Sequence, residues 1–187
     1  IQGTECLLVL QDGQTRQSTG LDMFLKKETA TVTAGEDWKP DFQLHVDFEI
    51  NYPGGGRYHR PYIAAWIEDD QGENIKTLCL WLELGSSWVS KLSRWNQIQD
   101  KDMSTIRTIT RATRMPGKYT LAWDGTNDAG DPVPTGRYNF YLEAVREKGT
   151  HQLIYEAIDI GDDSFRKVLK GNLEIKSAIL SYGQTTR

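Results

Sequence analysis

The chain has 187 residues, of which 38% are hydrophobic and 26% charged, so we expect one ordinary folded domain with a short extension and not a disordered chain. The formal net charge of −4 and the isoelectric point near 5.4 exclude the basic stripe of a nucleic-acid-binding surface. The sequence contains no run of about 18 apolar residues, so it predicts no membrane-spanning helix.

The N-terminal segment predicts a strand and then a linker. The chain begins at Ile1 without an initiating methionine or a signal peptide, so we expect a processed mature chain or a fragment of a longer protein. Residues 5–11 form an apolar run that ends at the turn pair Asp12-Gly13. Residues 26–40 have the polar composition of a linker.

Strand patterns dominate the next part of the chain. Residues 42–50 alternate between apolar and polar side chains, which predicts a strand with one buried face. Residues 51–61, NYPGGGRYHRP, contain glycines and prolines that prevent regular structure. Residues 61–68 and 76–84 flank turn residues and predict a hairpin. Alternation along the strands places three tryptophans in the core, namely Trp66, Trp81 and Trp123.

The period changes to that of a helix over residues 87–98. Trp88, Leu92 and Trp95 follow the spacing i, i+4, i+7, with Ser87 as the N-cap, and we expect this stripe to be core. A polar loop is expected over residues 101–116. Further strands are predicted at 118–123, 137–147, 151–159 and 172–181. This pattern favours a mainly β fold over residues 41–187, an antiparallel β-sandwich with one short helix.

Residues 123–140, WDGTNDAGDPVPTGRYNF, form a loop whose oxygen-bearing side chains allow two interpretations. Asp124, Asn127, Asp128 and Asp131 are weak candidates for cation ligands. A calcium loop of the helix-loop-helix kind needs D-x-[DN]-x-[DN]-G and a distal Glu, and this spacing is absent. Because Asp, Asn, Gly and Pro also build turns, we predict a hairpin connection without a tightly bound metal.

At this loop the sequence resembles known families. The pattern W-D-G-x-x-D-x-G-x-x-V-P-x-G-x-Y looks like the hairpin of Ig-like domains of the flagellar-hook-cap type. The ordered set RPYIAAWIEDDQGENIKTLCLW, SWVSKLSRW and ATRMPGKYTLAWDGTNDAGDPVPTGRY resembles a family of predicted periplasmic proteins with a domain of unknown function. The likeness covers about residues 42–160 and implies an Ig-like sandwich in the bacterial envelope. Members often occur beside flavin and iron-uptake proteins, and the family implies no established activity.

The first 25 residues resemble the C-terminal end of ApbE-type FAD:protein FMN transferases. The segment GTECLLVLQDGQTRQSTGLDMFL shows a strand, an Asp-Gly turn and then Ser18-Thr19-Gly20, which fits the S-x-G sequence at the end of those enzymes. Such transferases occur fused to this periplasmic domain, so the resemblance implies an accessory or binding module whose FAD, FMN and magnesium belong to a transferase. We expect the isolated chain not to be catalytic. The alternative is a flavin-carrying electron-transfer protein, or a part of the transferase itself.

Thr113 is a candidate flavin acceptor under the same resemblance. The transferase attaches FMN to a motif like [ST]-G-A-[ST], and this chain has Thr110-Arg111-Ala112-Thr113. Arg111 stands where the motif has glycine and would crowd a close backbone approach. The alternative is a polar loop that turns at Pro116-Gly117.

The tract GGGRYHRPY is the candidate contact surface for a ligand or partner. Arg57, His59 and Arg60 offer donors for a phosphate, a flavin or an acidic protein, and Tyr58 and Tyr62 offer aromatic faces. The alternative is a mobile loop with ordinary surface charges.

The sequence assigns no catalytic residue and no metal site. His45, His59 and His151 are far apart in the sequence and have no metal-ligand spacing. No serine has a nucleophile elbow around it. Cys6 and Cys79 form either one disulfide or two separate buried thiols.

Overall fold

The computed structural model describes residues 36–52, 54, 58–83, 87–98 and 103–185, and two short strands before them. The chain divides into two units, Ile1–Thr33 and Ala34–Arg187. In the first unit β1 (Leu8–Val9) and β2 (Thr15–Arg16) pair in an antiparallel ladder. The other predictions for residues 1–35, Cys6 included, lie outside the described residues.

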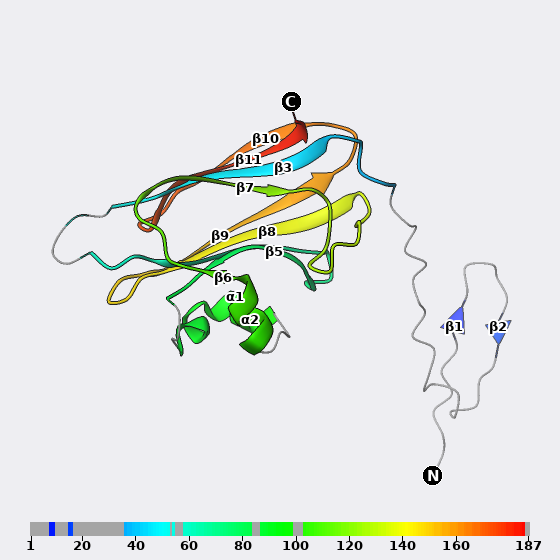
Figure 1. Cartoon of the computed structure of the whole chain (residues 1–187). Helices are drawn as coiled ribbons and strands as arrows, with labels where there is room; N and C mark the ends of the chain where they lie inside the picture. The colour runs from blue at the N-terminus through cyan, green and yellow to red at the C-terminus, as the bar shows by residue number, and fades with distance from the viewer. Residues whose placement is uncertain are drawn as a thin grey trace, which may run out of the picture. The chain divides into compact units, whose positions relative to one another are not determined.

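The second unit is a β-sandwich, which confirms the predicted fold class. One sheet has the order β10 (Phe165–Leu169), β11 (Ile175–Gln184), β3 (Phe42–Ile50), β7 (Gly117–Trp123). The other has the order β6 (Thr110–Arg111), β5 (Asn74–Trp81), β4 (Tyr62–Glu68), β8 (Gly136–Val145), β9 (His151–Ile160). The two sheets lie face to face (Figure 1), and their ladders are antiparallel except between β5 and β6.

The main core fills the space between the sheets. On β3 the predicted alternation holds, because Leu44, Val46, Phe48 and Ile50 are buried there. Trp81 and Trp123 belong to this core. Trp66 is also fully buried, but on the opposite face of its sheet. The prediction that all three tryptophans are core residues is therefore confirmed.

A helical layer covers the outer face of the five-stranded sheet, below it in Figure 1. It consists of the 3-10 helix η1 (Ser87–Lys91), α1 (Ser93–Ile98) and α2 (Met103–Ile109). Leu92, Trp95 and Ile106 pack on the second face of β4, which is buried throughout its length. The sequence predicted one helix over 87–98 and a loop over 101–116. It missed α2, β6 and also β10, because each is too short to show a period of its own.

Two buried carboxylates attach the helical layer to the sheet. Glu143 of β8 accepts hydrogen bonds from the backbone N–H of Arg94 at 3.1 Å and of Trp95 at 2.9 Å. These groups lie in the first turn of α1, where a carboxylate is favoured. Glu68 of β4 pairs with the Arg94 guanidinium at 2.7 Å and accepts from Trp66 Nε1 at 2.8 Å. The helices are therefore fixed in position by polar contacts as well as apolar packing.

Candidate functional site

The two sequence stretches that carry chemically interesting side chains lie at opposite ends of the sandwich. β3 and β7 are antiparallel, with Ile50 opposite Gly117 and Leu44 opposite Trp123. The loop that follows Ile50 and the loop that precedes Gly117 therefore share one end. The acidic loop that follows Trp123 lies at the other end (Figure 1).

In the acidic loop, the predicted weak metal ligands are held by turn hydrogen bonds. Asp124 Oδ1 accepts from the backbone N–H of Thr126 at 3.1 Å and from its hydroxyl at 2.7 Å. Asn127 Oδ1 accepts from the backbone N–H groups of Ala129 and Asp131, both at 2.9 Å. The hydrogen bond from the Thr126 hydroxyl is the main cause of a lowered pKa at Asp124.

Asp128 connects this loop to the edge of β5. Its carboxylate accepts from the backbone N–H of Thr77 at 2.9 Å and from Asn74 Nδ2 at 3.2 Å. Lys76 Nζ donates to the carbonyl of Asn127 at 2.7 Å. The part of the chain that the structure describes contains no group of three or more His, Cys, Asp or Glu side chains arranged to hold a metal. The oxygen-bearing side chains of this loop therefore have a role in building the turn, and the absence of a bound cation stays a prediction.

The glycine of the W-D-G pattern is required by a close approach. Gly125 has φ +78, and a Cβ there would lie 2.6 Å from the Trp38 ring. Trp38 belongs to the segment predicted as a linker, and it packs edge-on against Trp123 with ring centroids 4.8 Å apart. Trp123 Nε1 donates to the carbonyl of Thr126 at 2.8 Å. The pattern is therefore explained by packing and turn geometry.

At the other end, residues from four connections surround a pocket of about 320 Å³. The structure brings the candidate contact loop and the candidate flavin acceptor together there, because the lining includes Tyr58, His59, Arg60, Tyr62 and Thr113. Arg57 lies outside the described residues. Sequence reasoning missed two lining residues, Glu83 and Glu147, which follow the ends of β5 and β8. Only the strand register shows that these strand ends meet.

Most charged groups of this pocket have a partner. His59 Nδ1 lies 3.1 Å from a carboxylate oxygen of Glu147. The Tyr62 hydroxyl lies 3.5 Å from Glu83 Oε2. Burial, followed by the charges of Glu83 and Glu147, raises the pKa of Tyr62 to about 12. The two carboxylates are thus held against donors of the pocket wall.

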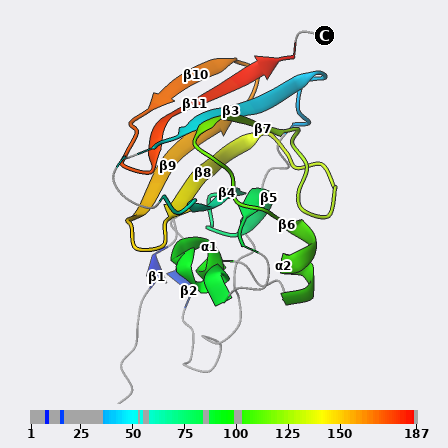
Figure 2. The same ribbon diagram turned by 60° about the vertical axis from the view of Figure 1, so that its left-hand side comes forward.

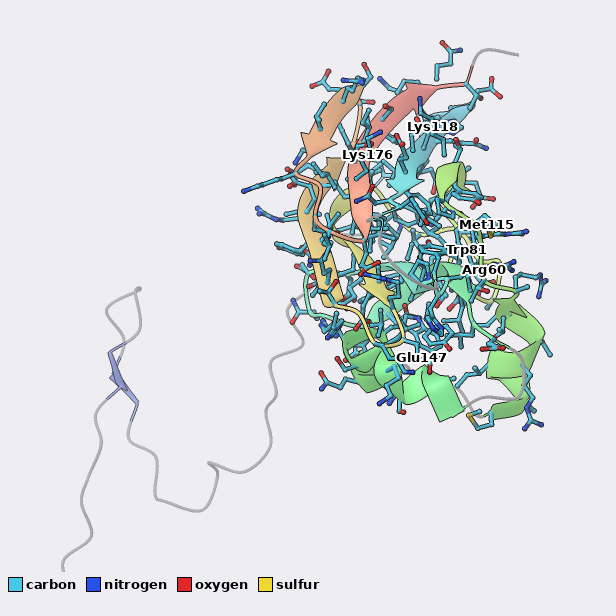
Figure 3. The ribbon with its side chains drawn as sticks, turned by 90° about the vertical axis from the view of Figure 1, so that its left-hand side faces the viewer. Arg60, Trp81, Met115, Lys118, Glu147 and Lys176 are labelled. Atoms are coloured by element: carbon cyan, nitrogen blue, oxygen red, sulfur yellow. The ribbon has the colours of Figure 1, made fainter. Side chains whose placement is uncertain are left out.

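Two donors of the pocket differ from the rest. Arg60 Nε contacts Met115 Sδ at 3.1 Å, and among the described residues no carboxylate pairs with its guanidinium. The Tyr58 hydroxyl is buried and has no hydrogen-bond partner in the described chain. Burial is also the main cause of a raised pKa at Tyr58, and the Glu174 charge follows. Figure 3 shows Arg60 close to Met115 and Trp81 at this end of the sandwich.

Two further buried polar atoms, Trp38 Nε1 and Asn74 Oδ1, lack a partner as well. Their side chains are held in other ways: the Trp38 ring packs on Trp123, and the Asn74 amide donates to Asp128. Tyr58 differs because its side chain helps to line a pocket that Arg60 also lines, and no described carboxylate pairs with the Arg60 guanidinium.

The segment compared with the flavinylation motif is part strand and part pocket wall. The Thr110 hydroxyl is buried and donates to the carbonyl of Ile106 at 2.7 Å. The Arg111 guanidinium donates hydrogen bonds to the carbonyls of Thr108 and Thr110. Thr113 is half-buried in the wall of the pocket. Of the two hydroxyls in the motif, Thr113 is therefore the one that faces a space for a ligand.

The histidines and the described cysteine have separate structural settings. His59 pairs with Glu147, and His151 pairs with the buried Glu143. Cys79 is a free, buried thiol, and burial raises its pKa to about 12. Because Cys6 lies outside the described residues, the choice between one disulfide and two separate thiols stays a prediction.

Comparison with known proteins gives one family and a set of flagellar relatives. A family model described as "Predicted periplasmic protein (DUF2271)" matches residues 43–177. The basal-body rod modification protein FlgD of Escherichia coli K12 is 30% identical over 89 residues, which is 48% of this chain and 37% of FlgD. FlgD of Salmonella typhimurium and of Salmonella typhi are each 32% identical over 89 residues, with the same coverage.

The chain thus spans well under half of the length of the curated relatives it matches. No solved structure matches it significantly. No helix in the described part of the chain has the length and apolar character needed to cross a membrane.

Proposed function

Because the chain belongs to this family of predicted periplasmic proteins, we propose that it is a non-catalytic binding domain whose contact region is the pocket between Tyr58 and Glu147. The periplasmic location expected from the sequence is that of the family. We infer that the domain serves a FAD:protein FMN transferase or another redox protein of the envelope, and that the pocket receives an anionic group of a ligand or partner.

The observation that carries this proposal is that one pocket is lined by a tyrosine whose hydroxyl has no described acceptor and by an arginine that no described carboxylate pairs with. A buried hydroxyl without an acceptor costs about 1–3 kcal/mol of stability. A guanidinium is the side chain best suited to a planar carboxylate or a phosphate. Tyr58 and Arg60 line the same pocket and lack such acceptors in the described chain. A bound anionic group would satisfy both.

Further support comes from the aromatic side chains at this end. Tyr52 and Tyr58 have ring centroids 5.2 Å apart, and Trp81 and Tyr119 have centroids 5.1 Å apart. The Arg114 guanidinium lies over Trp81 at 5.5 Å. Aromatic and arginine side chains are enriched where proteins bind partners. The volume of about 320 Å³ is at the small end of the range for ligand pockets.

The side chains of the pocket suit binding better than catalysis. His59 is paired with a carboxylate, and no hydroxyl or thiol of the described chain donates to it. The thiol of Cys79 lies in the core and not in the pocket lining, and burial raises its pKa to about 12, so it does not ionise near neutral pH. Transfer of FMN from FAD needs a metal held by acidic ligands, and the described residues offer no such group. The likeness of residues 1–25 to a transferase terminus motivates the choice of partner.

Two assays test the proposal. Incubation with FAD, magnesium and an acceptor protein that carries the flavinylation motif should give no covalent flavin on the acceptor above a control without the chain. Titration with FMN, which has a phosphate and an aromatic ring, should show binding that weakens about tenfold in Arg60→Met. Arg166→Met, on β10, is the matched control and should bind like the wild type. Flavin transfer by the chain would contradict the non-catalytic role.

A second candidate function is a covalent flavin carrier. The observation that favours it is the position of Thr113 in the same pocket as Tyr58, Tyr62 and Arg60. Co-expression with an ApbE-type transferase would then join FMN to the threonine hydroxyl as a phosphoester with release of AMP, giving a yellow protein heavier by one FMN less one water. Thr113→Ala should abolish the added mass, and Thr110→Ala should keep it as long as the domain folds. A colourless, unmodified wild-type chain would contradict this candidate.

A further inference from the structure

The side of the sandwich formed by β9 and β10 has two uncovered strand edges (Figure 2). β9 is the last strand of the five-stranded sheet, and β10 is the last strand of the four-stranded sheet. Within the described part of the chain, each has a ladder partner on one side only, β8 for β9 and β11 for β10. Such edges present unpaired backbone groups that can pair with another chain.

The hydrogen bonds show which backbone groups of β9 point outward. The turn between β8 and β9 is closed by a hydrogen bond from the Arg146 N–H to the Thr150 carbonyl. From Thr150 onward, every second residue of β9 therefore exchanges backbone hydrogen bonds with β8. The intervening residues of β9 include Leu153, Tyr155 and Ala157, and their N–H and C=O groups point away from β8. In agreement with this alternation, Lys167 Nζ of β10 donates to the outward-pointing Ala157 carbonyl at 2.6 Å.

Lys167 therefore covers one half of the β9 edge, and the other half is left open. Lys167 also pairs with Glu156 at 2.7 Å, so its charge is matched. At Leu153 and Tyr155, no described residue donates to or accepts from the outward backbone groups. A lysine over an edge is a known protection against strand pairing, and here it stops short of these two residues.

The open half of the edge is also apolar. Leu153, Tyr155 and Val168 have exposed fractions of 44%, 52% and 67%. Together with Leu173, they are more than half of the exposed large apolar side chains in the described chain. A groove of about 440 Å³ lies between the two edge strands, and its lining includes Leu153, Tyr155, Val168 and Lys170. Clustered apolar exposure of this kind marks an interaction site.

We propose that this groove binds an extended acidic segment of a partner protein, which adds to the five-stranded sheet as a strand beside Leu153 and Tyr155. Backbone pairing would supply affinity, and apolar side chains of the segment would cover the exposed ones. Charge selects the partner. Lys170, which follows β10, lines the groove, and Arg166 lies on β10; both are exposed, and neither has a carboxylate partner among the described residues. Glu156 also lines the groove, but its charge is matched by Lys167. Alternating acidic and apolar side chains would match this surface.

The test uses the whole chain and a short synthetic peptide in which valine and aspartate alternate. Calorimetric titration should show binding, and amide exchange at Leu153 and Tyr155 should slow. Lys170→Glu should weaken binding about fivefold or more and should favour a valine–lysine peptide instead. Lys118→Glu, a charge reversal on the far edge strand β7, should leave binding unchanged. Leu153→Pro removes an outward N–H and adds a ring, and it should abolish binding.

Circular dichroism of each variant checks that the fold is retained. If Leu153→Pro fails to fold, the charge reversal at Lys170 still decides the question. Equal binding of the acidic peptide by the wild type and Lys170→Glu would overturn the proposal. So would concentration-dependent dimerisation that Leu153→Pro prevents, because the groove would then receive a second copy of this chain. FMN binding at the pocket is independent of both outcomes.

Discussion

The two ends of the sandwich use their polar side chains differently. At the acidic-loop end, Asp124, Asn127 and Asp128 each accept hydrogen bonds from nearby residues, so the loop is closed on itself and on β5. At the pocket end, no described residue accepts from the Tyr58 hydroxyl and no described carboxylate pairs with Arg60. The first end is richer in potential ligand groups by sequence, but the second has the donors that lack an oxygen acceptor among the described residues.

This difference shows that residue type alone is a poor guide to a site. Asp and Asn build turns because their oxygens reach backbone N–H groups two to four residues away. When those hydrogen bonds are made, the same oxygens stabilise the turn and do not bind a ligand. Substitutions at the acidic-loop end should therefore affect stability, and substitutions at the pocket end should affect binding.

The largest expected effect on stability is at Gly125. Alanine there would have to adopt φ near +78, and its Cβ would meet the Trp38 ring at 2.6 Å. We expect Gly125→Ala to lower the free energy of unfolding by about 3 kcal/mol, measured by urea denaturation. Gly130→Ala is the control, because φ is +92 there but no atom of the described residues lies within 4 Å of the added Cβ. It should cost only about 1 kcal/mol. Equal losses would contradict the role of Trp38.

Asp128 should have the next largest effect. Its removal leaves the Thr77 N–H and the Asn74 amide without their acceptor. We expect Asp128→Ala to cost about 1–2 kcal/mol in urea denaturation. Asp131→Ala, which loses one exposed contact of 3.3 Å to Asn127, should cost less than about 0.5 kcal/mol. The reverse order would show that the loop is held in another way.

Two tyrosines compare the ends directly. The Tyr138 hydroxyl, near the acidic loop, donates to the Pro134 carbonyl at 2.6 Å, whereas the Tyr58 hydroxyl has no acceptor among the described residues. Tyr138→Phe should therefore lower the free energy of unfolding by about 1 kcal/mol. Tyr58→Phe should leave it unchanged or raise it, because phenylalanine removes a buried polar group that has no partner. A loss of 1 kcal/mol or more in Tyr58→Phe would mean that the hydroxyl is structural.

The smallest expected effect is that of calcium on the acidic loop. Because its oxygens already accept hydrogen bonds, added calcium should leave the melting temperature unchanged, as followed by circular dichroism. A cation at 100 times its dissociation constant would stabilise the fold by about 2.7 kcal/mol, which is easily detected. A shift of that size that disappears in Asp128→Ala would show a metal site.

The sequence predicted the sandwich well where periodicity is strong. The alternation of residues 42–50 and the aromatic strand at Gly136–Val145 made the sheets predictable. α2 was missed because only Ile106 and Ile109 mark its apolar side. The contacts that tie the buried carboxylates of Glu68 and Glu143 to α1 were also unpredictable, since Arg94 and Trp95 lie far from both in the sequence.

The candidate site was predicted in part. The tract that contains Tyr58, His59 and Arg60 was selected for its donors and rings, and these residues line the pocket. Glu83, Glu147 and the wall position of Thr113 depend on which strand ends meet, and that follows from register and not from local sequence. The absence of a partner for Tyr58 is a property of packing and has no sequence signal.

The most direct test of the account is an FMN titration of Tyr58→Phe and Tyr138→Phe beside the wild type, followed by flavin fluorescence at a temperature where all three chains are folded. We predict that Tyr58→Phe binds FMN about five- to tenfold more weakly than the wild type, because it lacks one hydrogen bond to the anionic group. Tyr138→Phe should keep the wild-type affinity. Equal affinities in all three chains, or no FMN binding by the wild type, would contradict the claim that the pocket end is the binding end.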